Sequence, residues 1–147
     1  MFLRDHPIFR EFRTLGFPSE DCVVAGSGPL LAHGIRSDIS DLDIVVNASL
    51  WESVKQLGQP TASPFGFVRH ILLFDGRIEI LNGWFAYDVN SLIAEAEFFE
   101  GVGFLPLERT LEWKSRLNRA KDRRDVELIA EYLEHGTPGV SETRPVL

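Results

Sequence analysis

One segment, residues 23–47, limits the folds open to this chain more than any other. It opens with an apolar run that stops at Gly26-Ser27, and such a run bounded by glycine is typical of a strand buried on both faces. A short helix should follow, with Ser27 as its N-cap and Gly34 at its end. An acidic loop and a second apolar run complete the segment, which predicts two buried strands joined through a short helix.

Two carboxylates mark the start of the second strand, in the sequence Asp41-Leu42-Asp43. Side chains alternate along a strand, so Asp41 and Asp43 share one face and the apolar residues share the other. Neighbouring carboxylates repel each other unless a proton or a cation lies between them. Mg²⁺ takes oxygen ligands and often binds through one or two carboxylates together with substrate phosphates. The pattern therefore predicts a metal site, with backbone N–H groups of the glycine-serine turn available to phosphate.

Length and composition indicate one globular domain. The chain has 147 residues, 44% of them hydrophobic and 25% charged, and we expect residues 1–135 to form a single domain with a mobile tail over 136–147. The net charge of −7 disfavours nonspecific binding to nucleic acid or to an anionic membrane. The single cysteine, Cys22, excludes an internal disulfide and suits a reducing compartment. Because no apolar run approaches the roughly 20 residues of a membrane helix, we expect a cytoplasmic protein.

The rest of the sequence predicts further helices and strands. Ser49 and Glu52 form a capping-box pattern for a helix through residue 57. Asp75-Gly76 is a two-residue hairpin signal between strands over 65–74 and 77–81, and Glu79 lies on one face of the second strand. Other helices are expected over 6–16, 91–96, 106–118 and 122–133, the last with Val126, Ile129, Ala130 and Leu133 as its apolar face, and a glycine-interrupted strand within 98–105. This order predicts an α/β or α+β domain with a mixed sheet flanked by helices.

The spacing of these motifs resembles that of the nucleotidyltransferase superfamily with the DNA-polymerase-β-like fold. Gly26-Ser27 is followed after thirteen residues by Asp41-Leu42-Asp43, and Ile78-Glu79-Ile80 resembles the later strand that carries the third carboxylate of the family. Small bacterial members, which include antibiotic-nucleotidylating enzymes and proteins of toxin–antitoxin pairs, are similar in three further places. These are His33-Gly34-Ile35-Arg36, Leu111-Glu112-Trp113-Lys114, and Arg119-Ala120-Lys121-Asp122 followed by Asp125-Val126. The resemblance covers residues 20–133 and implies a mixed, twisted sheet followed by C-terminal helices.

The resemblance also implies a reaction. Asp41, Asp43 and Glu79 would be the catalytic carboxylates and would hold one or two Mg²⁺ ions against a nucleoside triphosphate (NTP). An acceptor hydroxyl would attack the α-phosphate in line, with pyrophosphate leaving. The structural alternatives are surface positions for the two aspartates and a solvated edge face for Glu79 beside Arg77.

Four residues are implied in nucleotide binding: Gly26, Ser27, Arg36 and Lys121. Ser27 has an alternative role as a helix cap alone, and Arg36 could instead pair with Asp38 on the surface. Asp38 is expected to be a solvated or turn residue, outside the metal site.

A basic stretch stands out in this acidic chain, with six basic residues and one acid between Lys114 and Arg124. We interpret most of these residues, Lys114 included, as a solvated helix junction, and assign only Lys121 to a positive rim for substrate. His33 is expected to pack or cap a helix, and His70 has no predicted partner. The aromatic residues of the segment 84–87 are expected in the core or at its rim, with stacking on a nucleobase as the alternative.

Three functions follow from these features. The leading hypothesis is a small Mg²⁺-dependent nucleotidyltransferase that moves a nucleoside monophosphate from an NTP to a hydroxyl of a small molecule or a protein. The second is a non-catalytic or partner-dependent module, such as one component of a toxin–antitoxin pair, with a homodimer mate or another protein completing the acceptor pocket. The third, an RNA-modifying transferase, requires RNA binding through Arg116 to Arg124 and conflicts with the overall charge.

Overall fold

The two predicted central strands lie side by side in the computed structural model, which describes residues 2–136. β1 (Cys22–Ala25) and β2 (Leu42–Val46) are antiparallel, and every residue in both strands is buried. β2 also pairs in parallel with β5 (Ile78–Leu81), and β1 in parallel with β7 (Val102–Phe104). Both strands therefore have neighbours on each side, which explains their unbroken apolar runs.

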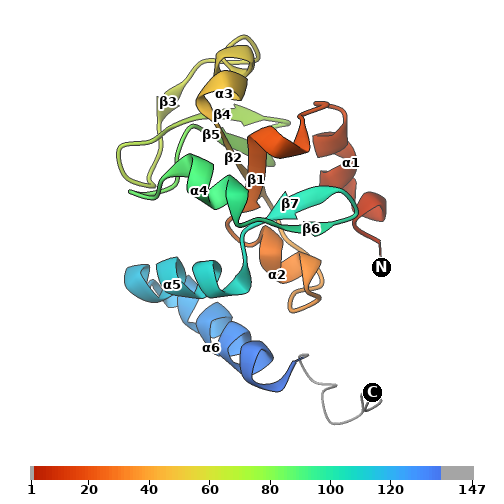
Figure 1. Ribbon diagram of the computed structural model, residues 1–147, viewed down its shortest axis with the longest axis vertical. Coiled ribbons are helices and arrows are strands. Elements are labelled where there is room, and N and C mark those ends of the chain that lie inside the picture. The colour runs from red at the N-terminus through yellow and green to blue at the C-terminus, as the bar shows by residue number, and fades with distance from the viewer. Residues whose placement is uncertain (1, 137–147) are drawn as a thin grey trace.

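Three further strands extend the sheet on its two sides. The strand order is β3-β4-β5-β2-β1-β7-β6, and both parallel and antiparallel pairs occur among the described residues. The predicted class, an α/β domain with a mixed sheet flanked by helices, is confirmed (Figure 1). The added strands are β3 (Thr61–Ala62), β4 (Arg69–Leu73) and β6 (Glu97–Phe99).

The predicted hairpin between β4 and β5 exists, but its loop is longer than two residues. The last strand pair is Leu73 with Ile78, which leaves residues 74–77 in the loop. Phe74 and Asp75 both have positive φ, at 54° and 57°, so the chain leaves the strand before the Asp75-Gly76 pair. The strand predicted over 65–74 is likewise shorter and begins only at Arg69.

The glycine-interrupted strand predicted within 98–105 is instead a second hairpin. β6 and β7 are antiparallel and join through Glu100-Gly101, where φ is 52° and 81°. These two residues form the turn, because positive φ at both positions is what a tight two-residue hairpin requires. Gly101 therefore reverses the chain.

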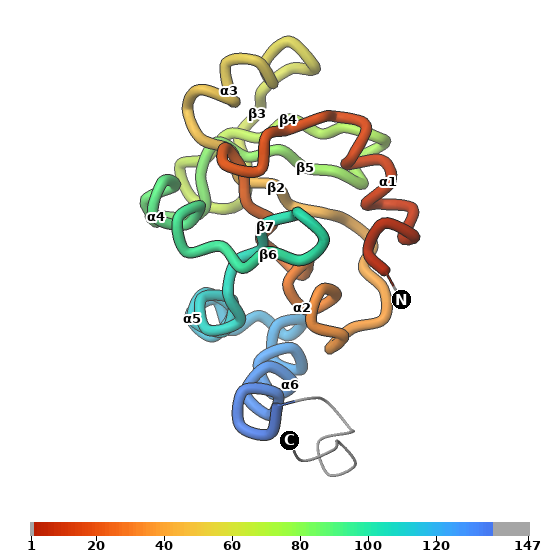
Figure 2. Tube along the Cα trace, turned by 45° about the vertical axis from the view of Figure 1, so that its right-hand side comes forward, coloured from red at the N-terminus to blue at the C-terminus, as the bar shows by residue number. Residues whose placement is uncertain are grey.

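Helices cover both faces of the sheet (Figures 1 and 2). α1 (Pro7–Arg13) and α3 (Ala48–Val54) pack on the face that carries Leu42, Ile44 and Val46. α4 (Val89–Ala94) and α5 (Leu107–Leu117) pack on the opposite face, against the side chains that alternate with them. The second face contains Val23, Ala25, Val45, Leu81, Trp84, Leu92 and Trp113.

The C-terminal helices lie at one end of the sheet, on the side away from α3 (Figure 1). α6 (Ala120–His135) follows α5, and both contact α2 (Gly28–Ala32), the short helix after the glycine-serine turn. Leu30, Leu107 and Ile129 form the centre of this contact. The helix pair is therefore attached to the element that begins at the predicted phosphate-binding turn.

Several predicted helix boundaries are wrong. α3 begins at Ala48, because Asn47 rather than Ser49 is its N-cap and accepts a hydrogen bond from the backbone N–H of Leu50. α4 begins two residues earlier than predicted, with Asp88 as its N-cap. α6 begins at Ala120. The tail predicted over 136–147 lies outside the described residues except for Gly136, which caps α6.

The buried face of α6 also differs from the prediction. Of the four residues predicted for it, only Ile129 is buried, while Ala130 and Leu133 are exposed. Asp122 and Asp125 take the other buried positions. A hydrophobic pattern alone could not identify this face, because charged residues make up most of it.

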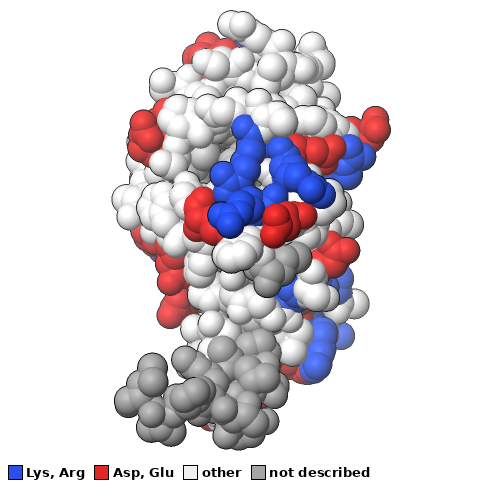
Figure 3. All heavy atoms as spheres, turned by 90° about the vertical axis from the view of Figure 1, so that its right-hand side faces the viewer, with Lys and Arg blue, Asp and Glu red and all other residues white. Residues whose placement is uncertain are grey.

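The surface carries mixed charge. On the face shown in Figure 3, basic side chains gather in the upper half with acidic side chains beside them. One such surface pair joins Arg77 to Glu11 of α1, at 2.5 Å. Within residues 2–136 no helix is both long and apolar enough to cross a membrane.

Candidate metal and nucleotide site

Three carboxylates meet on the face of the sheet that α4 and α5 cover. Asp43 and Glu79 are direct neighbours on the parallel strands β2 and β5, and Asp41 precedes Asp43 by two residues on the same face. One carboxylate oxygen from each residue lies within 4.8 Å of the others. The alternation predicted from sequence thus brings Asp41, Asp43 and Glu79 together, in an arrangement that could hold a metal ion.

Asp43 is the most buried of the three, with 9% of its surface exposed. Burial, and after it the charges of Glu79 and Asp41, raise its pKa to about 8, although the charges of Lys114 and Lys121 oppose the shift. Its Oδ1 atom is buried and accepts no hydrogen bond from any described residue. A buried carboxylate oxygen without a donor is destabilising, and a bound cation would remove that penalty. The donor set of three carboxylates fits Mg²⁺.

Gly26 must be glycine where it passes the carboxylates. Its φ is +61°, and a Cβ atom there would lie 2.1 Å from Oδ2 of Asp43. The backbone turn can therefore approach the cluster only without a side chain. Ser27 follows as the N-cap residue of α2, but its side chain makes no capping hydrogen bond within the described chain. The predicted capping position is confirmed, while the expected hydrogen bond is not formed.

A cavity of about 200 Å³ separates the carboxylates from the C-terminal helices. We call it the carboxylate cavity. It includes all four residues proposed for nucleotide binding, and Glu79 lies beside it through its contact with Asp43. Its lining consists of Gly26, Ser27, Arg36, Ser40, Asp41, Asp43, Phe65, Trp113, Lys114, Arg119, Lys121, Asp122 and Asp125.

The wall opposite the carboxylates is basic, and Lys114 is its buried centre. The predicted solvated position for Lys114 is wrong, because only 3% of its surface is exposed. Its Nζ atom lies 3.2 Å from Oδ2 of Asp125 and 3.5 Å from Oδ1 of Asp122. Two carboxylates of α6 thus hold a lysine of α5 in the wall of the cavity.

Two arginines extend the same wall. The side chain of Arg119 lies 2.6 Å from Asp122. Burial raises the pKa of Asp122, but the hydrogen bonds from Arg119 and the charge of Lys114 outweigh this effect and lower it overall. Arg36 lies 3.3 Å from Asp125 rather than pairing with Asp38 as the surface alternative required. With Lys121, the wall carries four cations against two aspartates, which suits an anionic ligand.

Sequence reasoning quoted Lys114, Asp122 and Asp125 within motifs of the family resemblance but gave them no role in the site. A signal was available in α6, where both aspartates fall on the same helical stripe as the buried Ile129, at spacings of three and four residues. Carboxylates on a buried stripe need a cation, and the nearest basic helix is α5. What the sequence could not show is which lysine or arginine meets them.

His70 has a partner that the sequence did not reveal. Its Nδ1 atom lies 2.8 Å from Oε2 of Glu79, across the pair formed by β4 and β5. Both side chains are mostly buried. This contact fixes one oxygen of the third carboxylate and thereby the direction of the other.

Other predicted residues lie away from the cavity. Asp38 contacts the ring of His6 and accepts a hydrogen bond from the backbone of Ile39. His33 caps α2 and contacts Tyr132 and Glu97, as its predicted structural role required.

Comparison with known proteins supports the fold. No protein-family model and no curated protein matches the sequence. Among solved structures, the chain is similar to a protein from Thermotoga maritima, described as a "putative nucleotidyltransferase" in its crystal structure at 1.87 Å resolution. The two share 17% sequence identity with a TM-score of 0.54, over 90% of this chain and 98% of the other. At this identity the likeness shows the fold alone: the chain has the nucleotidyltransferase fold expected from its motifs.

Proposed function

We propose that this protein is a Mg²⁺-dependent nucleotidyltransferase, which moves a nucleoside monophosphate from an NTP to an acceptor hydroxyl. The observation that carries the proposal is the carboxylate cavity, where Asp41 and Asp43, with Glu79 beside them, lie opposite a basic wall centred on the buried Lys114. A cation-binding cluster opposite a phosphate-binding wall is the arrangement that phosphoryl transfer needs.

The three carboxylates would hold the metal. The unpaired Oδ1 of Asp43 and the close approach of Gly26 to the same carboxylate support this assignment. When bound, Mg²⁺ would supply positive charge to the phosphates and help orient the reacting oxygens. His70 would keep Glu79 in place by holding one of its two oxygens.

The phosphates would lie between the turn and the basic wall. Gly26 and Ser27 would offer backbone N–H groups and a hydroxyl, and Arg36, Lys114 and Lys121 would balance negative charge. Lys114 acts here as a positioned charge, because Asp122 and Asp125 restrain its side chain. Its burial limits screening by solvent.

In the proposed reaction the acceptor oxygen bonds to the α-phosphorus, and the bond from that phosphorus to the bridging oxygen breaks. Pyrophosphate leaves with the electrons of the broken bond, and the hydroxyl loses its proton. Glu79, on β5, would favour transfer of this proton to solvent, while the basic wall would stabilise the charge that collects on the leaving group.

Binding and transfer measured with α-labelled NTPs test the proposal. We expect Mg²⁺-dependent NTP binding by the wild-type protein, and loss of that binding in the double variant Asp41→Asn, Asp43→Asn. The matched control is Asp38→Asn, in the same loop region but outside the carboxylate cavity. Absence of NTP binding, or equal binding by wild type and double variant, would refute the proposed function.

Two outcomes would separate the alternatives. Mg²⁺–NTP binding without transfer to any hydroxyl, restored by a stoichiometric partner protein from the native host, would favour the partner-dependent module. RNA binding that weakens steeply with salt and depends on Arg116 to Arg124 would favour an RNA acceptor.

A further inference from the structure

A second cavity, of about 220 Å³, lies beside the carboxylate cavity. Its lining comes from the loop after β5 and from the C-terminal half of α5: Phe85, Ala86, Tyr87, Trp113, Arg116 and Leu117. We call it the aromatic pocket. It is smaller than the about 300–1,000 Å³ of sites for drug-sized ligands and thus suits a ligand of one or two rings.

Trp113 joins the two cavities, because its side chain lines both. Its ring lies 5.7 Å from that of Phe85, at an interplanar angle of 34°. Phe85 in turn lies 5.5 Å from Phe65, which lines the carboxylate cavity. A continuous set of aromatic rings therefore leads from the carboxylates into the pocket.

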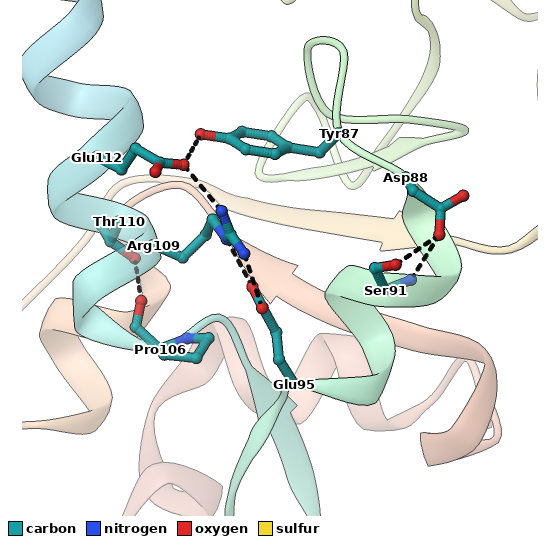
Figure 4. A network of polar contacts seen from close by, with 8 residues as sticks. All are labelled: Tyr87, Asp88, Ser91, Glu95, Pro106, Arg109, Thr110 and Glu112. Atoms are coloured by element: carbon teal, nitrogen blue, oxygen red, sulfur yellow. Dashed lines mark hydrogen bonds and ion pairs between the residues drawn. The ribbon is translucent and has the colours of Figure 1, made fainter.

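One wall of the pocket is held in place by a polar network (Figure 4). The hydroxyl of Tyr87 donates a hydrogen bond of 2.5 Å to Glu112 of α5. Arg109 binds the same carboxylate at 2.9 Å and contacts both oxygens of Glu95 at the end of α4. Tyr87 thus presents its ring to the pocket while its hydroxyl is already engaged, which favours an aromatic ligand over a hydroxyl-rich one.

A second wall of the pocket is formed by Phe85, whose backbone is strained. Phe85 has φ of +53°, a conformation that bulky residues rarely adopt. Its ring packs against Phe65, Trp84 and Trp113. This packing stabilises Phe85 beside the pocket in a backbone conformation that would otherwise favour glycine.

We infer that the aromatic pocket binds the nucleobase of the donor NTP, an inference that rests on the proposed function. Planar rings favour stacking with a base, and every base offers the faces for it. Arg116 on the exposed edge of the pocket supplies a guanidinium that can stack on the base or donate to its ring acceptors. A base that stacks on Trp113 would lie next to the phosphates, because Trp113 directly precedes Lys114 on α5.

The acceptor approaches from another direction. Glu79, which favours loss of the hydroxyl proton, lines neither cavity. Its cross-strand neighbour is Leu72 of β4, on the same face and 53% exposed. On the β4 side of Glu79, His70 contacts one carboxylate oxygen and Leu72 is exposed, whereas the aromatic pocket opens beside α5.

Two variants with opposite effects on the volume of the aromatic pocket test its assignment as the nucleobase site. Leu117→Trp fills the pocket, and Phe85→Gly removes one wall while suiting the positive φ. Leu133→Trp is the control, since Leu133 of α6 is similarly exposed, at 40% against 37%, and lines neither cavity. Calorimetry measures the affinity of each protein for Mg²⁺–ATP and for Mg²⁺–tripolyphosphate, and thermal unfolding verifies that each variant folds.

We expect wild type and Leu133→Trp to bind ATP about 5- to 100-fold more tightly than tripolyphosphate. Leu117→Trp and Phe85→Gly should lose most of this preference and keep the tripolyphosphate affinity. Equal affinity of wild type for the two ligands would overturn the base site while leaving the proposed function intact. Unchanged ATP affinity in both pocket variants with slower transfer would reassign the pocket to the acceptor. Failure of both ligands to bind would refute the proposed function itself.

Discussion

At the scale of single residues, Asp43 combines burial with a carboxyl oxygen that has no hydrogen-bond partner among the described residues. Its folded pKa of about 8 exceeds the about 4 of an unfolded aspartate, so the folded state holds the proton longer. Its contribution to stability is therefore complete below about pH 4 and is lost as pH rises toward 8. In metal-free protein at pH 8, we expect Asp43→Asn to raise the free energy of unfolding by at least about 1 kcal/mol.

Chemical denaturation from pH 5 to pH 8 measures this effect, and the gap between variant and wild type should widen with pH. Added Mg²⁺ should stabilise wild type and leave the variant unchanged, because a ligand stabilises only the state that binds it. A gap that is constant across this range would contradict the assignment of the shift to Asp43.

Gly26 tests how closely the turn must approach the carboxylates. Gly26→Ala adds a Cβ that overlaps Asp43, in addition to strain at φ +61°. Gly16→Ala is the matched control, since Gly16 has φ +65° and nothing within 4 Å of an added Cβ. We expect about 1–2 kcal/mol loss of stability for Gly16→Ala and a larger loss for Gly26→Ala, measured by denaturation. Equal losses would mean that the turn can move away from Asp43.

His70 tests the orientation of the third carboxylate. His70→Phe keeps a ring but removes the contact with Glu79, and we expect Mg²⁺ affinity to fall about 10-fold by calorimetry. His33→Phe is the control, because His33 contacts Tyr132 and Glu97 away from the carboxylates. An unchanged affinity in His70→Phe would show that Glu79 needs no such support.

At the scale of elements, strand alternation made part of the carboxylate cluster predictable. Alternation placed Asp41 and Asp43 on one face, whereas Glu79 was implied only by the family resemblance, and the parallel pairing of β2 with β5 brings it beside Asp43. The glycine-serine turn followed from the apolar run that it ends. Boundaries that depend on competing caps, such as Asn47 against Ser49, were not predictable, because both residues can cap a helix.

The hairpin of β6 and β7 and the junction of α5 with α6 were missed for a different reason. The turn at Glu100 depends on a non-glycine residue with positive φ, which no local pattern indicates. The pairing of Lys114 with Asp122 and Asp125 depends on how two helices cross. A lysine near a helix end is ordinarily solvated, and only tertiary contact reverses that expectation.

The junction gives a prediction at this scale. Lys114→Met keeps the aliphatic length of the side chain but leaves Asp122 and Asp125 without their shared cation. Removal of one partner from a buried ionic group costs about 3–5 kcal/mol, so we expect a loss of this size in thermal or chemical denaturation. Arg124→Met is the control, because Arg124 pairs with Glu127 on the surface. If Lys114→Met lowers the free energy of unfolding by less than about 1 kcal/mol, the lysine supplies charge to the cavity without stabilising the fold.

At the scale of the whole molecule, the proposed ligand spans two structural units. The carboxylates belong to the sheet, whereas three of the four cations of the basic wall, Lys114, Arg119 and Lys121, come from α5, from α6 and from the cap between them. The two units also meet through α2, where Leu30 packs with Leu107 and Ile129. A nucleotide in the carboxylate cavity would therefore add a second connection between them, on the side of the turn.

This connection predicts a local change in hydrogen exchange. With Mg²⁺ and a nonhydrolysable NTP, amides from Lys114 to Asp125 should exchange about 10-fold more slowly, because binding disfavours local opening of the helix junction. α3, on the opposite face of the sheet, is the internal control and should change little. The double variant Asp41→Asn, Asp43→Asn should show no protection at either place. Equal protection of α3 and the junction would indicate a global stabilisation, and would contradict a ligand that bridges the sheet and the C-terminal helices.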